Sequence, residues 1–214
     1  MKRNTATALF TFSLLLAPFH PVHPQVTDQS GAIGVNSTNR TSPVQALTFN
    51  GKFQLYVGDT YGPRAWLTSA STAGIRQWIN SPPEWEQGMR GYARRFASSM
   101  GENAIRNTVR FGVGAALHED PRYFPSVRKG ILRRSWYAVT FVFVPRNDHG
   151  ERTLGVSRLA GALSSGFISN TWYPERLSDT SHAMSRAGIA LGGDAALNLF
   201  HEFWPDIKRA VFGR

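Results

Sequence analysis

Two histidine–glutamate pairs, His118-Glu119 and His201-Glu202, are the residues of this chain whose types and spacing could do chemistry. Imidazole and carboxylate groups together bind zinc or iron, and the chain has no cysteine to add a thiolate ligand. Each pair follows a small, apolar run and precedes a proline, Pro121 or Pro205. If the two stretches pack together, the four side chains could hold a divalent metal. If they lie apart, each pair ends a helix, where histidine complements the helix dipole.

A second candidate site overlaps the first pair. Glu119, Asp120 and Arg122 could form an acid and base pair in the cleft of a small hydrolase, although structural ion pairs use the same residue types more often. The sequence contains no Gly-x-Ser-x-Gly elbow, phosphate loop or dinucleotide fingerprint. The leading interpretation is therefore a protein without enzymatic activity or cofactor, with the divalent metal as the alternative.

The N-terminal residues indicate export. Residues 1–25 combine basic Lys2 and Arg3 with an apolar run and a proline-rich end, as signal peptides do. Residues 26–46 are rich in Ser, Thr, Asn, Gln and Gly, which predicts a disordered polar spacer. Residues 47–214 are numerous enough for one domain with its own core. We expect a periplasmic protein or one associated with the cell-envelope membrane.

The charge balance favours anionic partners. The 24 Lys and Arg residues outnumber the 14 Asp and Glu residues, and removing Lys2 and Arg3 with the signal lowers the net charge from +10 to +8. For an exported protein we expect anionic lipid, lipopolysaccharide or another envelope protein as the partner, and no nucleic acid. A well-solvated basic surface without a partner is the alternative.

Helix signals predict a single all-α domain of five to seven closely packed helices within residues 47–214. Apolar residues at helical spacing predict a helix over 47–62, and Pro63 predicts the start of the next. Ser81-Pro-Pro-Glu84 places a capping serine before a proline and three residues ahead of a glutamate, which predicts the start of a long helix ending at Pro121.

The second half of the chain contains one ambiguous element. Residues 136–144 are β-branched and aromatic, which favours a strand, but no partner strand is evident and we take the segment as a buried helix. The basic segment 127–134 before it has Ile131 and Leu132 as its apolar contacts. Two more helices are expected, one over 154–170 and one from about Ser178 to Pro205.

Small residues are expected to set the helix packing. Gly161 and Gly166 lie on one predicted helix, and Gly188 and Gly192 are spaced by four residues on the next, which lets backbones approach closely. Tryptophans and tyrosines beside arginines could serve an interface with lipid or glycan. Their regular helical spacing instead predicts that they belong first to the core.

Several short motifs are spread over the predicted domain: Tyr61-Gly-Pro-Arg64, Pro83-Glu-Trp85, His118-Glu-Asp-Pro-Arg-Tyr-Phe124, Thr171-Trp-Tyr-Pro174 and Glu202-Phe-Trp-Pro-Asp-Ile207. Together they resemble those of uncharacterised exported proteins of acidobacteria and similar Gram-negative bacteria. The resemblance spans roughly the whole of the predicted domain and implies an envelope location, with no activity to transfer.

Three functional hypotheses follow. The leading one is a non-enzymatic envelope protein that associates with a membrane surface or another envelope component. The second is a small periplasmic hydrolase using the metal or acid–base residues named above. The third is a polytopic membrane protein built from short, glycine-rich helices.

Overall fold

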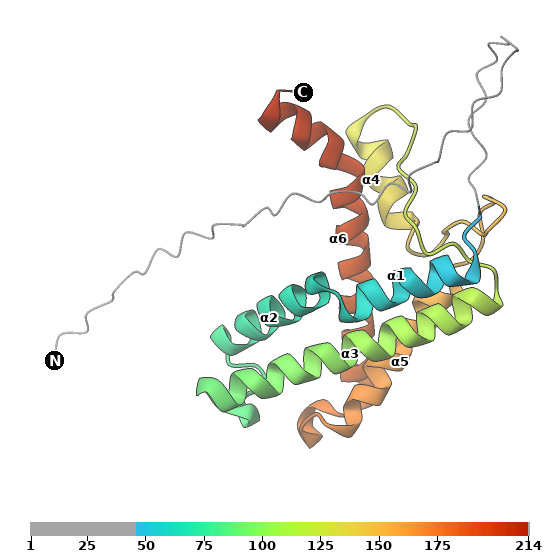
Figure 1. The fold of residues 1–214 in the computed structure, drawn as a ribbon. Coiled ribbons are helices and arrows are strands. Elements are labelled where there is room, and N and C mark those ends of the chain that lie inside the picture. The colour runs from blue at the N-terminus through green and yellow to red at the C-terminus, as the bar shows by residue number, and fades with distance from the viewer. Residues whose placement is uncertain (1–45, 214) are drawn as a thin grey trace, which may run out of the picture. The chain divides into compact units, whose positions relative to one another are not determined.

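The computed structural model describes residues 46–213, without the side chain of Phe212, so the predicted signal peptide and nearly all of the spacer lie outside the described residues. The described chain belongs to one unit, Thr41–Arg214, which confirms the predicted single all-α domain (Figure 1). Its six α-helices are α1 (Phe49–Tyr61), α2 (Pro63–Trp78), α3 (Gly88–Ala116), α4 (Ile131–Thr140), α5 (Val156–Ile168) and α6 (Thr180–Phe212). Three short 3-10 turns join them: Pro83–Trp85, Ser169–Thr171 and Glu175–Leu177.

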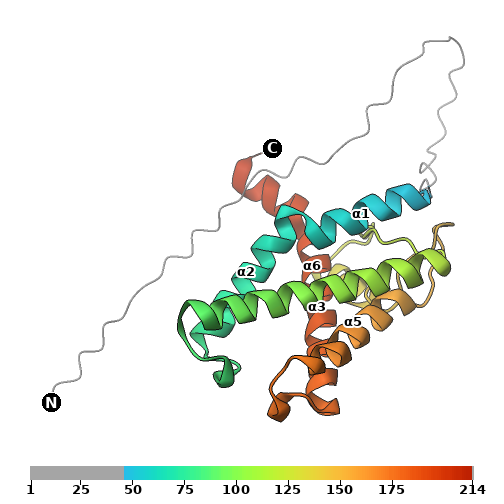
Figure 2. The ribbon, with the colours of Figure 1, turned by 60° about the horizontal axis from the view of Figure 1, so that its bottom comes forward.

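Helix α3 is the central packing element. It packs against α5 on one side and against α2 and α1 on the other, while α6 packs against α5 and α4. Figures 1 and 2 show α6 crossing behind α3. The first helices begin as the sequence predicts, because the Thr48 hydroxyl accepts a hydrogen bond from the Gly51 amide and Pro63 stands at the first turn of α2.

The predicted helix start at Ser81 is wrong, since α3 begins only at Gly88. The carbonyl groups of Ser81, Pro82 and Glu86 accept hydrogen bonds from the fully buried guanidinium of Arg95 at 2.7–3.0 Å. Glu86 also has a φ of 58°, outside the helical region. A long-range contact therefore bends this segment away from the helix that its residues favour.

The prediction that Ile131 and Leu132 make the apolar contacts of the basic segment 127–134 is also wrong. Ile131 and Leu132 are mostly exposed, whereas Tyr137 and Ala138 form the buried face of α4. The helical interpretation of the ambiguous segment is confirmed as far as Thr140, and the chain then turns. Phe141 and Val142 are buried in that turn.

Small residues pack closely where α5 meets its neighbours. A Cβ atom on Gly161 would lie 2.6 Å from the Arg106 carbonyl oxygen of α3, and one on Gly166 would collide with the Ala183 carbonyl of α6. The predicted close packing at Gly188 and Gly192 is wrong, since a Cβ atom on either would have open space around it. The close approach of α6 instead uses the buried Ala183 and Ala187.

Pro205 does not end the last helix as predicted, because α6 continues to Phe212. Arg134 of α4 binds Glu202 before the proline at 2.8 Å and Asp206 after it at 2.5 Å. Its guanidinium also lies 4.6 Å from the centre of the Phe203 ring. These contacts span the turn in which proline removes one backbone hydrogen bond and hold the helix together there.

The aromatic residues depart from the predicted core. Trp85 is buried, but Trp66, Trp78 and Trp136 are mostly exposed, because alanines fill the contacts between helices. None of the described helices is long and apolar enough to span a membrane.

Candidate functional site

A cleft of about 890 Å³ opens between α2 and α6. Residues of α2, among them Arg64 and Thr72, line one wall, and residues of α6, among them Asp194 and His201, line the other. The floor comes from α3 and α5. Its volume falls within the range of ligand-binding pockets.

The cleft carries a surplus of positive charge. Its three acidic residues are Asp59, Glu102 and Asp194, and its seven arginines are Arg64, Arg76, Arg106, Arg110, Arg122, Arg158 and Arg186. Near its centre, the nearly buried Asp194 faces Arg106 at 3.7 Å and Arg110 at 3.5 Å. These separations exceed an ordinary charge-assisted hydrogen bond, so one carboxylate is shared loosely between two cations.

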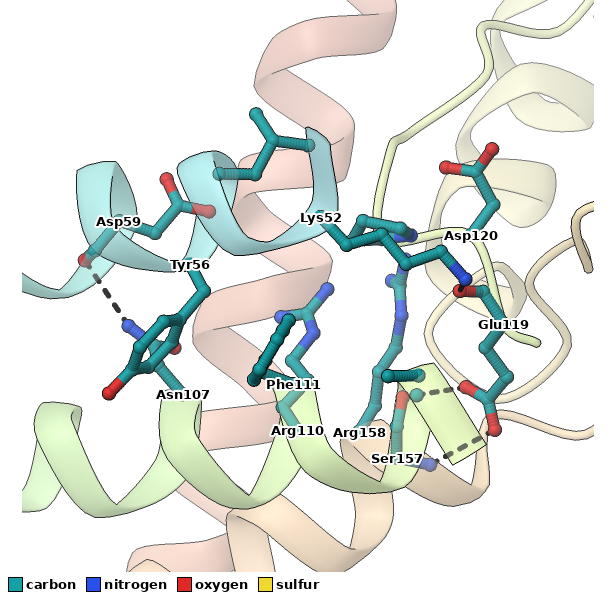
Figure 3. Close-up of a pocket in the computed structure, with 14 residues that line it drawn as sticks. Lys52, Tyr56, Asp59, Asn107, Arg110, Phe111, Glu119, Asp120, Ser157 and Arg158 are labelled. Atoms are coloured by element: carbon teal, nitrogen blue, oxygen red, sulfur yellow. Dashed lines mark hydrogen bonds between the residues drawn. The ribbon is translucent and has the colours of Figure 1, made fainter. Parts of the chain in front are cut away.

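A smaller cavity of about 60 Å³ adjoins the cleft, because Asn107, Arg110 and Arg158 line both (Figure 3). Lys52 enters it from α1 and donates to the Glu119 carbonyl oxygen at 3.0 Å and to Asp148 at 2.8 Å. The cavity has room for a few water molecules or one small polar group.

Glu119 forms the far end of this cavity and caps α5. Its carboxylate accepts hydrogen bonds from the Ser157 amide at 3.1 Å and the Ser157 hydroxyl at 2.6 Å. Ser157 lies in the first turn of α5, where backbone amides lack helical partners. A negative charge there interacts favourably with the positive end of the helix dipole. Buried Glu119 therefore has a structural role that its type and position explain.

Arg158 stands between the cleft and the cavity and is 4% exposed. Figure 3 shows its side chain rising from α5 between Arg110 and Glu119. It makes no hydrogen bond or ion pair with any residue that the structure describes, and its guanidinium carbon lies 5.1 Å from the centre of the Phe141 ring. Its nitrogen atoms still reach the open space of the cleft and cavity, but burial limits the water around them, and a ring face compensates for only part of that loss.

The electrostatics of Arg158 reflect this arrangement. Burial lowers the pKa of Arg158 to about 9, and Arg110 contributes to the lowering. Asp194, Glu119 and Asp120 act in the opposite direction without cancelling it. The side chain stays protonated at neutral pH, so an anion that reached it would gain a charged and incompletely solvated partner.

The structure does not bring the two histidine–glutamate pairs into one group. His118 follows α3 with its ring 76% exposed and 3.6 Å from Asp148, and the Glu119 carboxylate binds Ser157. His201 lies on the cleft wall within α6, and buried Glu202 binds Arg134. The described residues hold no group of three or more His, Asp or Glu side chains that could bind a metal ion.

The proposed acid–base residues do lie together, but as a structural pair. Asp120 is buried beside the cavity, and Arg122 binds both of its carboxylate oxygens, with the shortest contact at 2.6 Å. The Asp120 amide also donates to the Arg146 carbonyl oxygen at 2.9 Å. These contacts fix the loop after α3 in place.

Sequence reasoning missed Lys52, Ser157, Asp194 and Arg158 as site residues. A signal existed for Arg158, which is the single charged residue among the thirteen of α5. A lone arginine in a small, apolar helix needs a buried partner or a ligand. Lys52 and Asp194 gave no comparable signal, because charged residues are ordinary on helices.

Comparison of the chain with protein-family models, with curated proteins and with solved structures gives no match. The function is therefore argued from the geometry of the cleft.

Proposed function

We propose that the protein is a non-enzymatic binding protein whose cleft holds the phosphate or carboxylate group of an anionic ligand. The observation that carries this proposal is Arg158, a buried guanidinium at the junction of the cleft and the cavity that has no hydrogen-bond partner among the described residues. Arg106 and Arg110 line the same cleft and face Asp194 at 3.7 and 3.5 Å, and Arg106 also donates to the Asn103 side chain at 3.0 Å. An oxyanion between these arginines would satisfy donors that the protein leaves unused.

Binding is favoured over catalysis because Glu119 and Asp120, the carboxylates that the sequence offered for acid–base chemistry, are already engaged. Both oxygens of Glu119 accept hydrogen bonds from Ser157, and both oxygens of Asp120 accept from Arg122. A general acid or base needs an oxygen that faces the substrate. The export expected from the sequence suggests a ligand from the cell envelope, such as an anionic lipid or lipopolysaccharide.

The test is thermal unfolding of the full-length protein in inorganic phosphate, compared with chloride at equal ionic strength. A ligand that binds only the folded state adds about 2.7 kcal/mol of stability at one hundred times its dissociation constant. We expect phosphate to raise the melting temperature of the wild type and to lose this effect in Arg158→Met. A series of dicarboxylates at the same ionic strength then separates phosphate from carboxylate recognition.

Phosphate also stabilises proteins generally by exclusion from their surfaces, so a control variant is needed. Arg176→Met serves, because Arg176 is exposed and pairs with Glu84 outside the cleft. It should keep the wild-type response to phosphate. An equal response in the wild type and in Arg158→Met would refute the proposal.

A further inference from the structure

A second basic region, which shares only its first residues with the lining of the cleft, surrounds α4. Residues 121–147 contain six Lys and Arg residues and no Asp or Glu. Lys129 and Arg133 are exposed there, as is the side chain of Arg128. Arg122 and Arg134 pair with acidic residues, so these three side chains supply the exposed surplus of positive charge of the region.

The inner face of α4 is fixed to the rest of the domain. The Tyr137 hydroxyl donates to the Phe124 carbonyl oxygen at 3.0 Å, and Arg134 binds Glu202 and Asp206 of α6. Ala138 is completely buried against this contact. These contacts fix the orientation of α4, so the opposite face of the helix points away from the domain.

That outer face is apolar. Leu132 and Trp136 lie one helical turn apart and are 86% and 68% exposed, and Ile131 beside them is 73% exposed. Val127, in the loop before the helix, is 98% exposed. We call this surface the α4 face. It consists of these four large apolar side chains and the exposed basic side chains of Arg128, Lys129 and Arg133, and water solvates its apolar part poorly.

We propose that the α4 face docks on an anionic lipid bilayer, with Val127, Ile131, Leu132 and Trp136 entering the headgroup region and the basic residues contacting lipid phosphates. This combination is that of interfacial amphipathic helices, and tryptophan favours the boundary between headgroups and acyl chains. The inference does not depend on the ligand of the cleft, because it uses different residues.

Charge distinguishes this surface from another exposed apolar region. Trp78, Ile79 and Met89 are also exposed at the end of α2 and the start of α3, but Glu84 and Glu86 lie in the segment between them. Carboxylates there would be repelled by anionic lipid, whereas the α4 face carries none. The second region therefore supplies a matched control.

The absence of cysteine makes a direct test possible, since one introduced cysteine can be labelled alone. Full-length Leu132→Cys and Met89→Cys proteins would each carry an environment-sensitive fluorophore and be mixed with vesicles of phosphatidylglycerol or phosphatidylcholine. We expect a blue shift for the label at position 132 with the anionic vesicles alone, decreasing as salt is raised. The label at position 89 should keep its spectrum.

Two variants test the basic residues. Lys129→Gln with Arg133→Gln should weaken binding to anionic vesicles about fivefold for each residue removed. Arg90→Gln with Arg94→Gln removes the same charge from exposed positions on α3 and should change binding little. Equal weakening by both pairs would reduce the proposal to a general charge effect and overturn it.

The remaining outcomes of the fluorescence test also decide the matter. A shift at position 132 that needs no vesicles and grows with protein concentration would identify a second copy of the chain as the occupant and overturn lipid docking. Equal spectral shifts of the labels at positions 132 and 89 would also overturn lipid docking. So would the absence of any shift at position 132 with anionic vesicles.

Discussion

Arg95 and Arg158 are both more than nine-tenths buried, yet their surroundings differ completely. Arg95 donates four hydrogen bonds, to the Gln77 side chain and to the carbonyl groups of Ser81, Pro82 and Glu86. Arg158 donates none to the described residues and lies against the Phe141 ring beside open space.

The difference separates a structural charge from one available to a ligand. Arg95 replaces its water shell with fixed carbonyl oxygens and organises the segment between α2 and α3, so its burial stabilises the fold. Arg158 is buried without a hydrogen-bond partner among the described residues, and the protein tolerates this because the guanidinium still reaches a cavity that water or an anion can enter. Stability measurements should therefore respond oppositely to the loss of the two side chains.

The largest expected effect belongs to Arg95→Met. Removing the guanidinium leaves three carbonyl groups without their buried donor, and we expect the free energy of unfolding to fall by about 3–5 kcal/mol. Urea unfolding followed by circular dichroism measures the change. The free energy of unfolding of Arg95→Lys should lie between the values for Arg95→Met and the wild type. A loss below about 1 kcal/mol in Arg95→Met would show that Arg95 is not structural.

Glu202 extends the comparison to a buried carboxylate. Burial opposes ionisation, but hydrogen bonds from Arg134, the Ser126 amide and Tyr123 hold the pKa of Glu202 below its ordinary value of 4.5. A lowered carboxylate pKa stabilises the fold at higher pH, and this contribution decreases as the pH falls below about 4.5 toward the lower folded-state pKa. Glu202→Gln should cost about 2 kcal/mol at pH 7 and flatten the loss of stability in acid. Urea unfolding at pH 3 to 7 tests both, and an unchanged acid dependence would remove Glu202 as its source.

Glu119→Gln should act on both stability and binding. Loss of the charged cap of α5 should cost about 1 kcal/mol, because the amide can still accept a hydrogen bond. The same change removes a negative charge near Arg158 and should tighten phosphate binding measured by calorimetry. Weaker phosphate binding at unchanged stability would instead assign Glu119 to the binding site itself.

The smallest change in stability is expected for Arg158→Met. Methionine fills similar space without a charge to desolvate, so the free energy of unfolding should stay the same or rise by up to about 1 kcal/mol. Chemical unfolding in chloride buffer measures it. A loss above about 1.5 kcal/mol would mean that Arg158 stabilises the fold as Arg95 does, and the contrast between them would fail.

The sequence predicts the all-α fold because helix signals are local. The apolar spacing of residues 47–62 and the proline at position 63 act within a few turns, and the structure confirms the two helices they predict. Ser81 and Pro205 carry equally clear local signals, but Arg95, 14 residues after Ser81, and Arg134, which lies on α4, override them. A contact across many residues leaves no spacing pattern by which it could be recognised.

The candidate site was partly predictable for the same reason. The sequence identified Glu119 and Asp120, which do line the cavity, but gave them catalytic roles that their hydrogen-bond partners do not support. Which buried charge lacks a partner depends on where α5 lies relative to α3 and α6. Only the packed structure shows that Arg158 is that charge.

The arrangement of the helices also has a dynamic consequence. The α2 wall of the cleft packs against α1 and α3, whereas the α6 wall packs against α5 and α4. Among the described ion pairs, Asp194 joins α6 to α3 through the long contacts to Arg106 and Arg110, which salt weakens. Fluctuations that separate the two walls can therefore leave the α2–α3 and α5–α6 contacts in place, so the cleft is where the domain can widen without unfolding.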